Sequence, residues 1–134
     1  MTPFHLKIVT PDGLIYDGQA EELLVRTING DIGILARHMN YVAHLGMGQA
    51  VIVSGGQRRT AACIGGMVSV HNGEVTLVPT TFEWADKIDL PRAQAAREKA
   101  EKILHDENAS DTDLRLAEAK LRRALVRTSV ASKQ

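Results

Sequence analysis

The chain has 134 residues, enough for about one domain with a real core, and it contains a single cysteine. Its 16 basic residues balance its 16 acidic residues. This balance removes the general attraction to phosphate on which nucleic-acid binders and polybasic membrane anchors depend, so no nucleic-acid partner is expected. No stretch approaches the roughly 20 apolar residues of a spanning helix, so membrane association is expected only through a partner.

The first part of the chain has the pattern of short strands separated by turns. The turn signals are Pro11-Asp12-Gly13, Asn29-Gly30, Ser54-Gly55-Gly56 and Asn72-Gly73. Asn-Gly suits a type I′ turn because both residues tolerate a positive φ. The expected strands are 4–10, a return strand from residue 14, 22–28, 51–53, 67–70 and 74–78. Such spacing fits an antiparallel sandwich or a flattened barrel, and we favour a β sandwich of two packed antiparallel sheets over residues 1–86.

After Asp89 the apolar residues recur every three or four positions, as in a helix with one buried face. Asp89 can cap this helix, and Pro91 is tolerated in its first turn because the amide that it lacks would have no intrahelical partner. The expected buried stripe is Ala93, Ala96, Ala100, Ile103 and Leu104.

A polar break over residues 106–111 separates this helix from a second one, which Ser110 or Asp111 can cap. The stripe expected on the second helix is Leu114, Ala117, Leu121, Ala124 and Leu125. Residues 87–134 are therefore predicted to form a C-terminal antiparallel α-helical hairpin.

Alanine dominates both helical stripes and offers little apolar area for burial. A hairpin built this way is expected to be a loosely docked, detachable arm. The alternative is a permanently folded cap on the β module.

Enzyme signatures are missing from the sequence. The histidines are scattered without the spacing of a zinc site, and there is no Gly-x-Ser-x-Gly elbow. Cys63 lies in an apolar stretch and is expected to be a core residue. Gly46-Met47-Gly48 is interpreted as a strand junction, because no third glycine follows at Val51. We therefore expect no catalytic site and no metal site.

Several segments, in order and at matching separations, carry a resemblance to a known family. They are the loop Gly30-Asp31-Ile32-Gly33-Ile34-Leu35 with His38 after it, Gly65-Gly66-Met67, Asn72-Gly73-Glu74-Val75, and Ile88-Asp89 with Arg92-Ala93. Together they resemble the epsilon subunit of the bacterial rotary F-type ATP synthase, over nearly the whole chain.

The resemblance implies a non-catalytic subunit of the central stalk, which couples rotation of the membrane ion ring to ATP synthesis. The partners that it implies are the gamma shaft, the c-subunit ring, and the alpha and beta subunits of the catalytic head. The location that it implies is the cytoplasmic face of the bacterial cell membrane, as a peripheral subunit. In this family the helical arm either folds against the sandwich or extends into the head and blocks ATP hydrolysis. The alternative is a free-standing ATP-binding sensor outside the synthase.

The resemblance also implies a regulatory ATP, with or without magnesium, and no catalytic cofactor. The residues carried over for ATP binding are Glu83, Ile88, Asp89, Arg92, Ala93, Arg122 and Arg123. An arginine can clamp phosphate, while a carboxylate can accept hydrogen bonds from adenine or ribose. Lys99 and Val126 stand where tight binders carry further arginines. The alternative is that Asp89 only caps a helix and Arg92 is a solvated charge.

Two regions are expected to contact partners. By resemblance, Asp31 and the loop around it face the ring, and His38 belongs to the same partner surface; here Ala36 stands where the family often has a proline. The second helix has a basic face made by Arg115, Lys120, Arg122, Arg123 and Arg127. In the family this face meets an acidic segment of the catalytic subunits. The alternative for the Asp31 loop is a plain hairpin turn, and the alternative for the basic face is a solvated helix surface.

Overall fold

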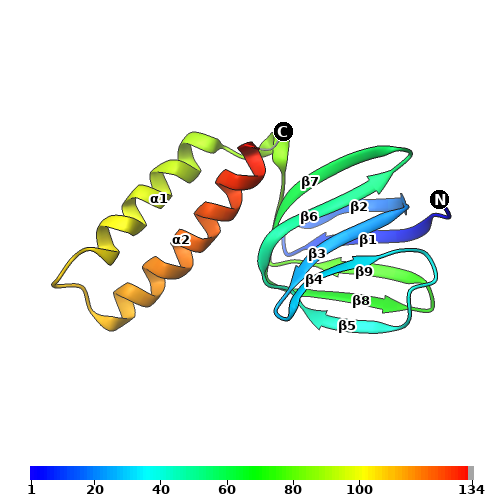
Figure 1. Ribbon diagram of the computed structural model, residues 1–134, viewed down its shortest axis with the longest axis horizontal. Coiled ribbons are helices and arrows are strands. Elements are labelled where there is room, and N and C mark those ends of the chain that lie inside the picture. The colour runs from blue at the N-terminus through cyan, green and yellow to red at the C-terminus, as the bar shows by residue number, and fades with distance from the viewer. Residues whose placement is uncertain (133–134) are drawn as a thin grey trace. The chain divides into compact units, whose positions relative to one another are not determined.

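The structure is a computed structural model that describes residues 1–132, and the chain divides into two compact units after Trp84. Within the described residues the first unit contains ten strands: β1 (Phe4–Thr10), β2 (Gly13–Ala20), β3 (Glu22–Thr27), β4 (Gly30–Ile34), β5 (Tyr41–His44), β6 (Met47–Ser54), β7 (Gln57–Ile64), β8 (Met67–His71), β9 (Glu74–Val78) and β10 (Thr81–Trp84). They form two five-stranded sheets, in the orders β2-β1-β9-β8-β5 and β10-β7-β6-β3-β4. The predicted β sandwich is confirmed (Figure 1).

The core of this unit lies between the two sheets because alternate residues of each strand point inward. Leu6 and Ile8 of β1 are fully buried, as are Val25 of β3 and Leu77 of β9. One strand pair departs from the antiparallel prediction. β1 pairs with β9 in parallel, with Leu6 opposite Val75 and Ile8 opposite Leu77. This short ladder joins the β1–β2 hairpin to the rest of its sheet.

Two of the turns share a geometry that the sequence did not predict. Thr27 lies opposite Gly30, its hydroxyl accepts a hydrogen bond from the amide of Asn29 at 3.1 Å, and the hydroxyl donates to the carbonyl of Gly30 at 2.8 Å. Thr10 makes the same pair of contacts around the turn at 11–12. At Asn29-Gly30 only the glycine has a positive φ, whereas a type I′ turn needs a positive φ at both central residues, so the type I′ prediction is wrong there. The type I′ prediction fits Asn72-Gly73, where φ is 50° and 83°.

The segment that was expected to be a loop around Asp31 is the edge strand β4. Ile34 is buried and Ile32 packs against the core, while Asp31 and Gly33 face away. The two glycines in five residues hid this alternation of apolar and polar positions.

The second unit begins with the 3₁₀ turn η1 (Ala85–Lys87) and contains α1 (Leu90–Leu104) and α2 (Asp111–Ser132). Asp89 caps α1, and its carboxylate accepts a hydrogen bond from the amide of Arg92 at 3.1 Å. Ser110 does the same for α2, with its hydroxyl 3.1 Å from the amide of Asp113. The two helices pack against each other as the predicted antiparallel hairpin (Figure 1).

The buried residues of the two helices are mainly alanines, as the stripe predicted. Ala93 and Ala100 of α1 are buried, and so are Ala117 and Ala124 of α2. Ala96 and Leu125 were expected in the same stripes but are exposed. A seam that repeats every seven residues is narrower than the predicted stripe, which leaves both outside it. Neither α1 nor α2, as far as residue 132, has the length and apolar content that a membrane-spanning helix needs.

Candidate functional site

Asp31 lies on the outer face of β4, where it forms an ion pair with Arg26 of the neighbouring strand β3. The Nε of Arg26 is 3.1 Å from Oδ1 of Asp31, and both side chains are about half exposed. The stem of Arg26 lies across Gly46 and Gly48. A Cβ built at Gly48 would stand 2.7 Å from the Cβ of Arg26. The glycines therefore leave the room that lets Arg26 reach Asp31, so this surface presents a charge pair and not a lone acid.

His38 lies in the connection between β4 and β5, beside a residue with an unusual backbone. Arg37 has a φ of 66°, a conformation that side-chain-bearing residues rarely adopt. The His38 ring donates from Nδ1 to the carbonyl of Met39 at 2.8 Å and makes an edge contact with Tyr41. Met39 is 75% exposed. This loop therefore presents the positive charge of the exposed Arg37 near the solvent-facing apolar side chain of Met39.

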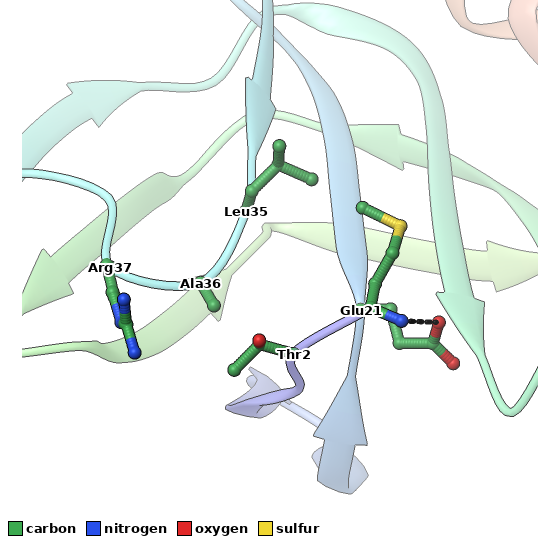
Figure 2. A pocket seen from close by; sticks show the side chains of 6 residues that line it. Thr2, Glu21, Leu35, Ala36 and Arg37 are labelled. Atoms are coloured by element: carbon green, nitrogen blue, oxygen red, sulfur yellow. Dashed lines mark ion pairs between the residues drawn. The ribbon is translucent and has the colours of Figure 1, made fainter.

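An open hollow of about 270 Å³ lies beside this loop. Figure 2 shows Leu35, Ala36 and Arg37 on one wall, with Thr2 and Glu21 on the other. The carboxylate of Glu21 lies 4.0 Å from the amino group of Met1. None of the residues predicted to bind ATP lines this hollow.

Four of the predicted ATP-binding residues are grouped at the start of α1. Ile88 is half-buried, Ala93 is buried, and Asp89 and Arg92 are exposed. One carboxylate oxygen of Asp89 is occupied by the helix cap, which leaves the other oxygen available. The guanidinium of Arg92 has no hydrogen-bond or ion-pair partner among residues 1–132. The helix N-terminus adds its own partial positive charge, which favours an anion.

Arg122 and Arg123 lie near the middle of α2. Since the helices run antiparallel, the first turn of α1 lies beside the last turns of α2 (Figure 1). Arg92 and the two arginines of α2 come from different helices of the hairpin. Glu83, the remaining predicted ligand, belongs to β10 of the first unit, opposite Ala62 of β7.

The predicted basic face of α2 is present, with one of its charges neutralised locally. Arg115, Lys120 and Arg122 are exposed, and Arg123 and Arg127 are half-buried. An NH group of Arg122 lies 2.9 Å from the carboxylate of Glu118, one turn earlier. Leu116, which is 56% exposed, lies within this basic surface.

Within residues 1–132, no three histidine, cysteine or acidic side chains are grouped so that they could hold a metal ion. Cys63 is buried on β7, as expected, and burial raises the pKa of its thiol to about 12. This thiol stays protonated near neutral pH.

An aromatic cluster at one edge of the sandwich was missed by sequence reasoning. Trp84 makes edge contacts with Phe82 and Tyr16, at centroid distances of 4.9 and 6.5 Å. The guanidinium carbon of Arg59 lies 3.6 Å from the centroid of a Trp84 ring. Tyr16 and Trp84 belong to edge strands of opposite sheets, and nothing in the sequence signals that these strands meet.

Comparison with known proteins covers both units. The model of the ATP synthase delta/epsilon chain β-sandwich domain matches residues 3–85, and that of the delta/epsilon long α-helix domain matches residues 86–132. The ATP synthase epsilon chain of Ruminococcus albus is 40% identical over 135 residues, covering 100% of both chains. That of Bacillus velezensis is 41% identical over 131 residues, covering 98% of each.

Two solved structures share the fold at low sequence identity. A chain of the Euglena gracilis mitochondrial ATP synthase has a TM-score of 0.85 at 20% identity, covering 100% of this chain and 83% of that one. A chain from the central stalk and c-ring of the Tetrahymena thermophila enzyme has a TM-score of 0.67 at 11% identity, covering 95% of each. From the two family models, matched in order along the chain, and from relatives about 40% identical over their whole length, we conclude that this protein belongs to the delta/epsilon chain family of ATP synthase.

Proposed function

We propose that this chain is the epsilon subunit of an F-type ATP synthase and acts as a non-catalytic part of its central stalk. The observation that carries the proposal is the match of both units, in order, to the two domains of that family, with relatives matched end to end. The proposed partners are the gamma shaft, the c-subunit ring and the alpha and beta subunits. The proposed location is the cytoplasmic face of the bacterial membrane, reached through these partners.

This proposal is tested by isolating the chain with an affinity tag from native membranes. We expect it to bring down gamma, alpha and beta subunits in defined stoichiometry. Recovery of the chain alone, from both membranes and cytosol, would instead support a free-standing sensor. A variant with Arg26→Ala and Asp31→Ala tests whether the charge pair on β3 and β4 contributes to the ring contact.

The helical hairpin is proposed to be a mobile arm that restrains ATP hydrolysis. The structure supports this because the hairpin belongs to a compact unit of its own, and the residues buried in its two helices are small: Ala93, Ala100, Ala117, Ala124 and Val130. The basic face of α2 would meet acidic groups of the catalytic head through complementary charge.

Truncation before Asp89 tests the arm directly. The assembled enzyme should keep ATP synthesis and gain hydrolysis activity, because the inhibitory element is gone. Reversal of two charges in the full chain, Arg115→Glu and Arg123→Glu, should have a similar but smaller effect. Unchanged hydrolysis after truncation would reject an inhibitory arm.

We further propose that ATP, with or without magnesium, is a regulatory ligand of the arm. Asp89, Arg92 and the free end of α1 offer a carboxylate, a guanidinium and a helix N-terminus, a combination suited to a nucleotide phosphate and its ribose. Arg122 and Arg123, on the neighbouring helix α2, belong to the same proposed set. Ile88, Ala93 and Glu83 complete the proposed set.

Calorimetric titration of ATP into the full chain tests this ligand. Asp89→Asn is the informative variant because asparagine keeps the helix cap and removes the charge. Together with Arg92→Gln it should abolish the binding heat, while the control Arg97→Gln, on the same helix, should not. Absence of heat at millimolar ATP, supported by a second binding method, would mean that Asp89 and Arg92 serve the helix alone.

A further inference from the structure

His5 lies on the outer face of β1 between two carboxylates from two other strands. Its Nε2 is 2.5 Å from Oδ1 of Asp17 on β2, and its Nδ1 is 2.5 Å from Oε2 of Glu74 on β9. The ring therefore spans three neighbouring strands of one sheet. All three side chains are partly exposed, so protons exchange freely with solvent.

The strands that meet at His5 are joined within the sheet by a short ladder. The β1–β2 hairpin is connected to the rest of its sheet through the parallel β1–β9 pairing, which spans three residue pairs. Parallel pairing is slightly less stable per residue than antiparallel pairing. A contact from β2 through β1 to β9 therefore reinforces the sheet at its ladder with the fewest residue pairs.

The protonation state of His5 decides how many of these contacts exist. A protonated imidazole donates from both nitrogens, so it can satisfy Asp17 and Glu74 together. A neutral imidazole has one N–H, so one carboxylate then faces a lone pair of the ring. We propose that His5, Asp17 and Glu74 form a proton-dependent clamp that holds the β1–β2 hairpin against β9.

The other charged groups around the clamp do not replace its cation. Lys7, two residues further on β1, lies opposite Asp17 in the β1–β2 register, and it lowers the pKa of that carboxyl only as a minor contribution after His5. His71 of β8 lies opposite Glu74 and hydrogen-bonds to Asn72. Neither places a second cation between the two carboxylates.

The sign of the pH dependence follows from these contacts. The hydrogen bond to Asp17, and after it that to Glu74, raises the pKa of His5. The stability that the clamp contributes is therefore fully present below the ordinary histidine pKa of about 6.5 and is lost as pH rises through the raised value. At the acid end it is lost as pH falls through the lowered pKa of Asp17.

The test uses the full chain and two measurements. Histidine titration by NMR should place the pKa of His5 above its ordinary value, and the variant D17N/E74Q should return it to that value. Amide exchange of β1 and β2 is then compared between the parent chain and H5Q at each pH, so that intrinsic exchange rates cancel. Protection of the parent chain relative to H5Q should be greater at pH 5 than at pH 9, by a factor of about ten for each pH unit by which the measured pKa of His5 exceeds its ordinary value.

H44Q is the matched control, since His44 lies on the outer face of the same sheet at β5 and has no ion pair among the described residues. It should leave the pH dependence of exchange unchanged. The clamp is overturned if His5 titrates at its ordinary value, or if the pH dependence of β1–β2 protection persists unchanged in H5Q. Should H5Q fail to fold, the single variants D17N and E74Q carry the same comparison.

Discussion

At the scale of single residues, burial determines the chemistry of Cys63. Its position in an apolar run predicted a core residue, and the structure places it in the sandwich core with 4% of its surface exposed. Desolvation disfavours the thiolate, which is the form that reacts.

We expect Cys63 in the native chain to resist a thiol reagent such as DTNB at pH 8, because its pKa is raised to about 12. The same chain unfolded in guanidinium chloride should react at the rate of a free cysteine. Reaction of the native chain at that rate would show that the thiol is accessible.

Gly48 shows how the absence of a side chain can position another residue. A Cβ at this position would stand 2.7 Å from the Cβ of Arg26, an atom close to the backbone that cannot swing away.

Gly48→Ala should therefore lower the free energy of unfolding in urea by about 1–3 kcal/mol, the usual cost of overpacking, and should displace Arg26 from Asp31. Gly33→Ala is the matched control, since its φ is ordinary and no atom lies within 4 Å of the added Cβ. Equal stability of the two variants would contradict the close approach of Arg26.

At the scale of elements, the strands with strong local signals were predicted, and those that depend on a distant partner were not. Phe4–Thr10 and Glu74–Val78 were expected with the boundaries that the structure has. β5 and β10, with four residues each, were not expected. β10 is a strand because the edge of β7 offers it hydrogen-bond partners from Ala61 to Ile64. Such partners are invisible in a local window of sequence.

The helices were predicted with their caps because capping is a local interaction. The widths of the buried helix faces were not predicted correctly, since Ala96 and Leu125 were expected to be buried and are exposed. Which side of a helix is covered depends on the crossing of its neighbour, and periodicity alone does not determine it.

The alanine seam leads to a prediction at this scale. Ala117→Leu should destabilise the hairpin by about 1–3 kcal/mol, because the buried position has no room for three further carbons. Ala96→Leu adds the same side chain at an exposed position of α1 and should change stability by less than about 0.5 kcal/mol. Urea unfolding followed by circular dichroism at 222 nm compares them; equal losses would mean that the seam is not tightly packed.

At the scale of the whole molecule, the chain consists of two units with separate cores. The residues that form the sandwich core, as described, lie between Phe4 and Phe82, and the buried alanines of the hairpin come from α1 and α2.

Residues 1–86 should therefore fold without the hairpin. The fragment should show a cooperative urea transition in the fluorescence of Trp84, with a midpoint close to that seen by the same signal in the full chain. A fragment without a cooperative transition, or with a far lower midpoint, would show that the sandwich depends on the second unit.

The sequence by itself determined the division into a β unit and a helical unit, the turns that contain glycine, and both helix caps. It also carried the resemblance to the epsilon subunit, since short motifs in order are a property of the chain. These features depend on neighbours within about four residues, where local sterics and hydrogen bonding suffice.

Only the tertiary structure decided which strands lie side by side, and with them the surroundings of single side chains. The parallel β1–β9 pair brings His5 to Glu74, 69 positions away, while Asp17 approaches from the other side. The need for glycine at position 48 likewise depends on Arg26, whose side chain lies across it from another strand. Long-range pairing is selected by burial of the whole core and by the paths of the connections, so no local pattern contains it.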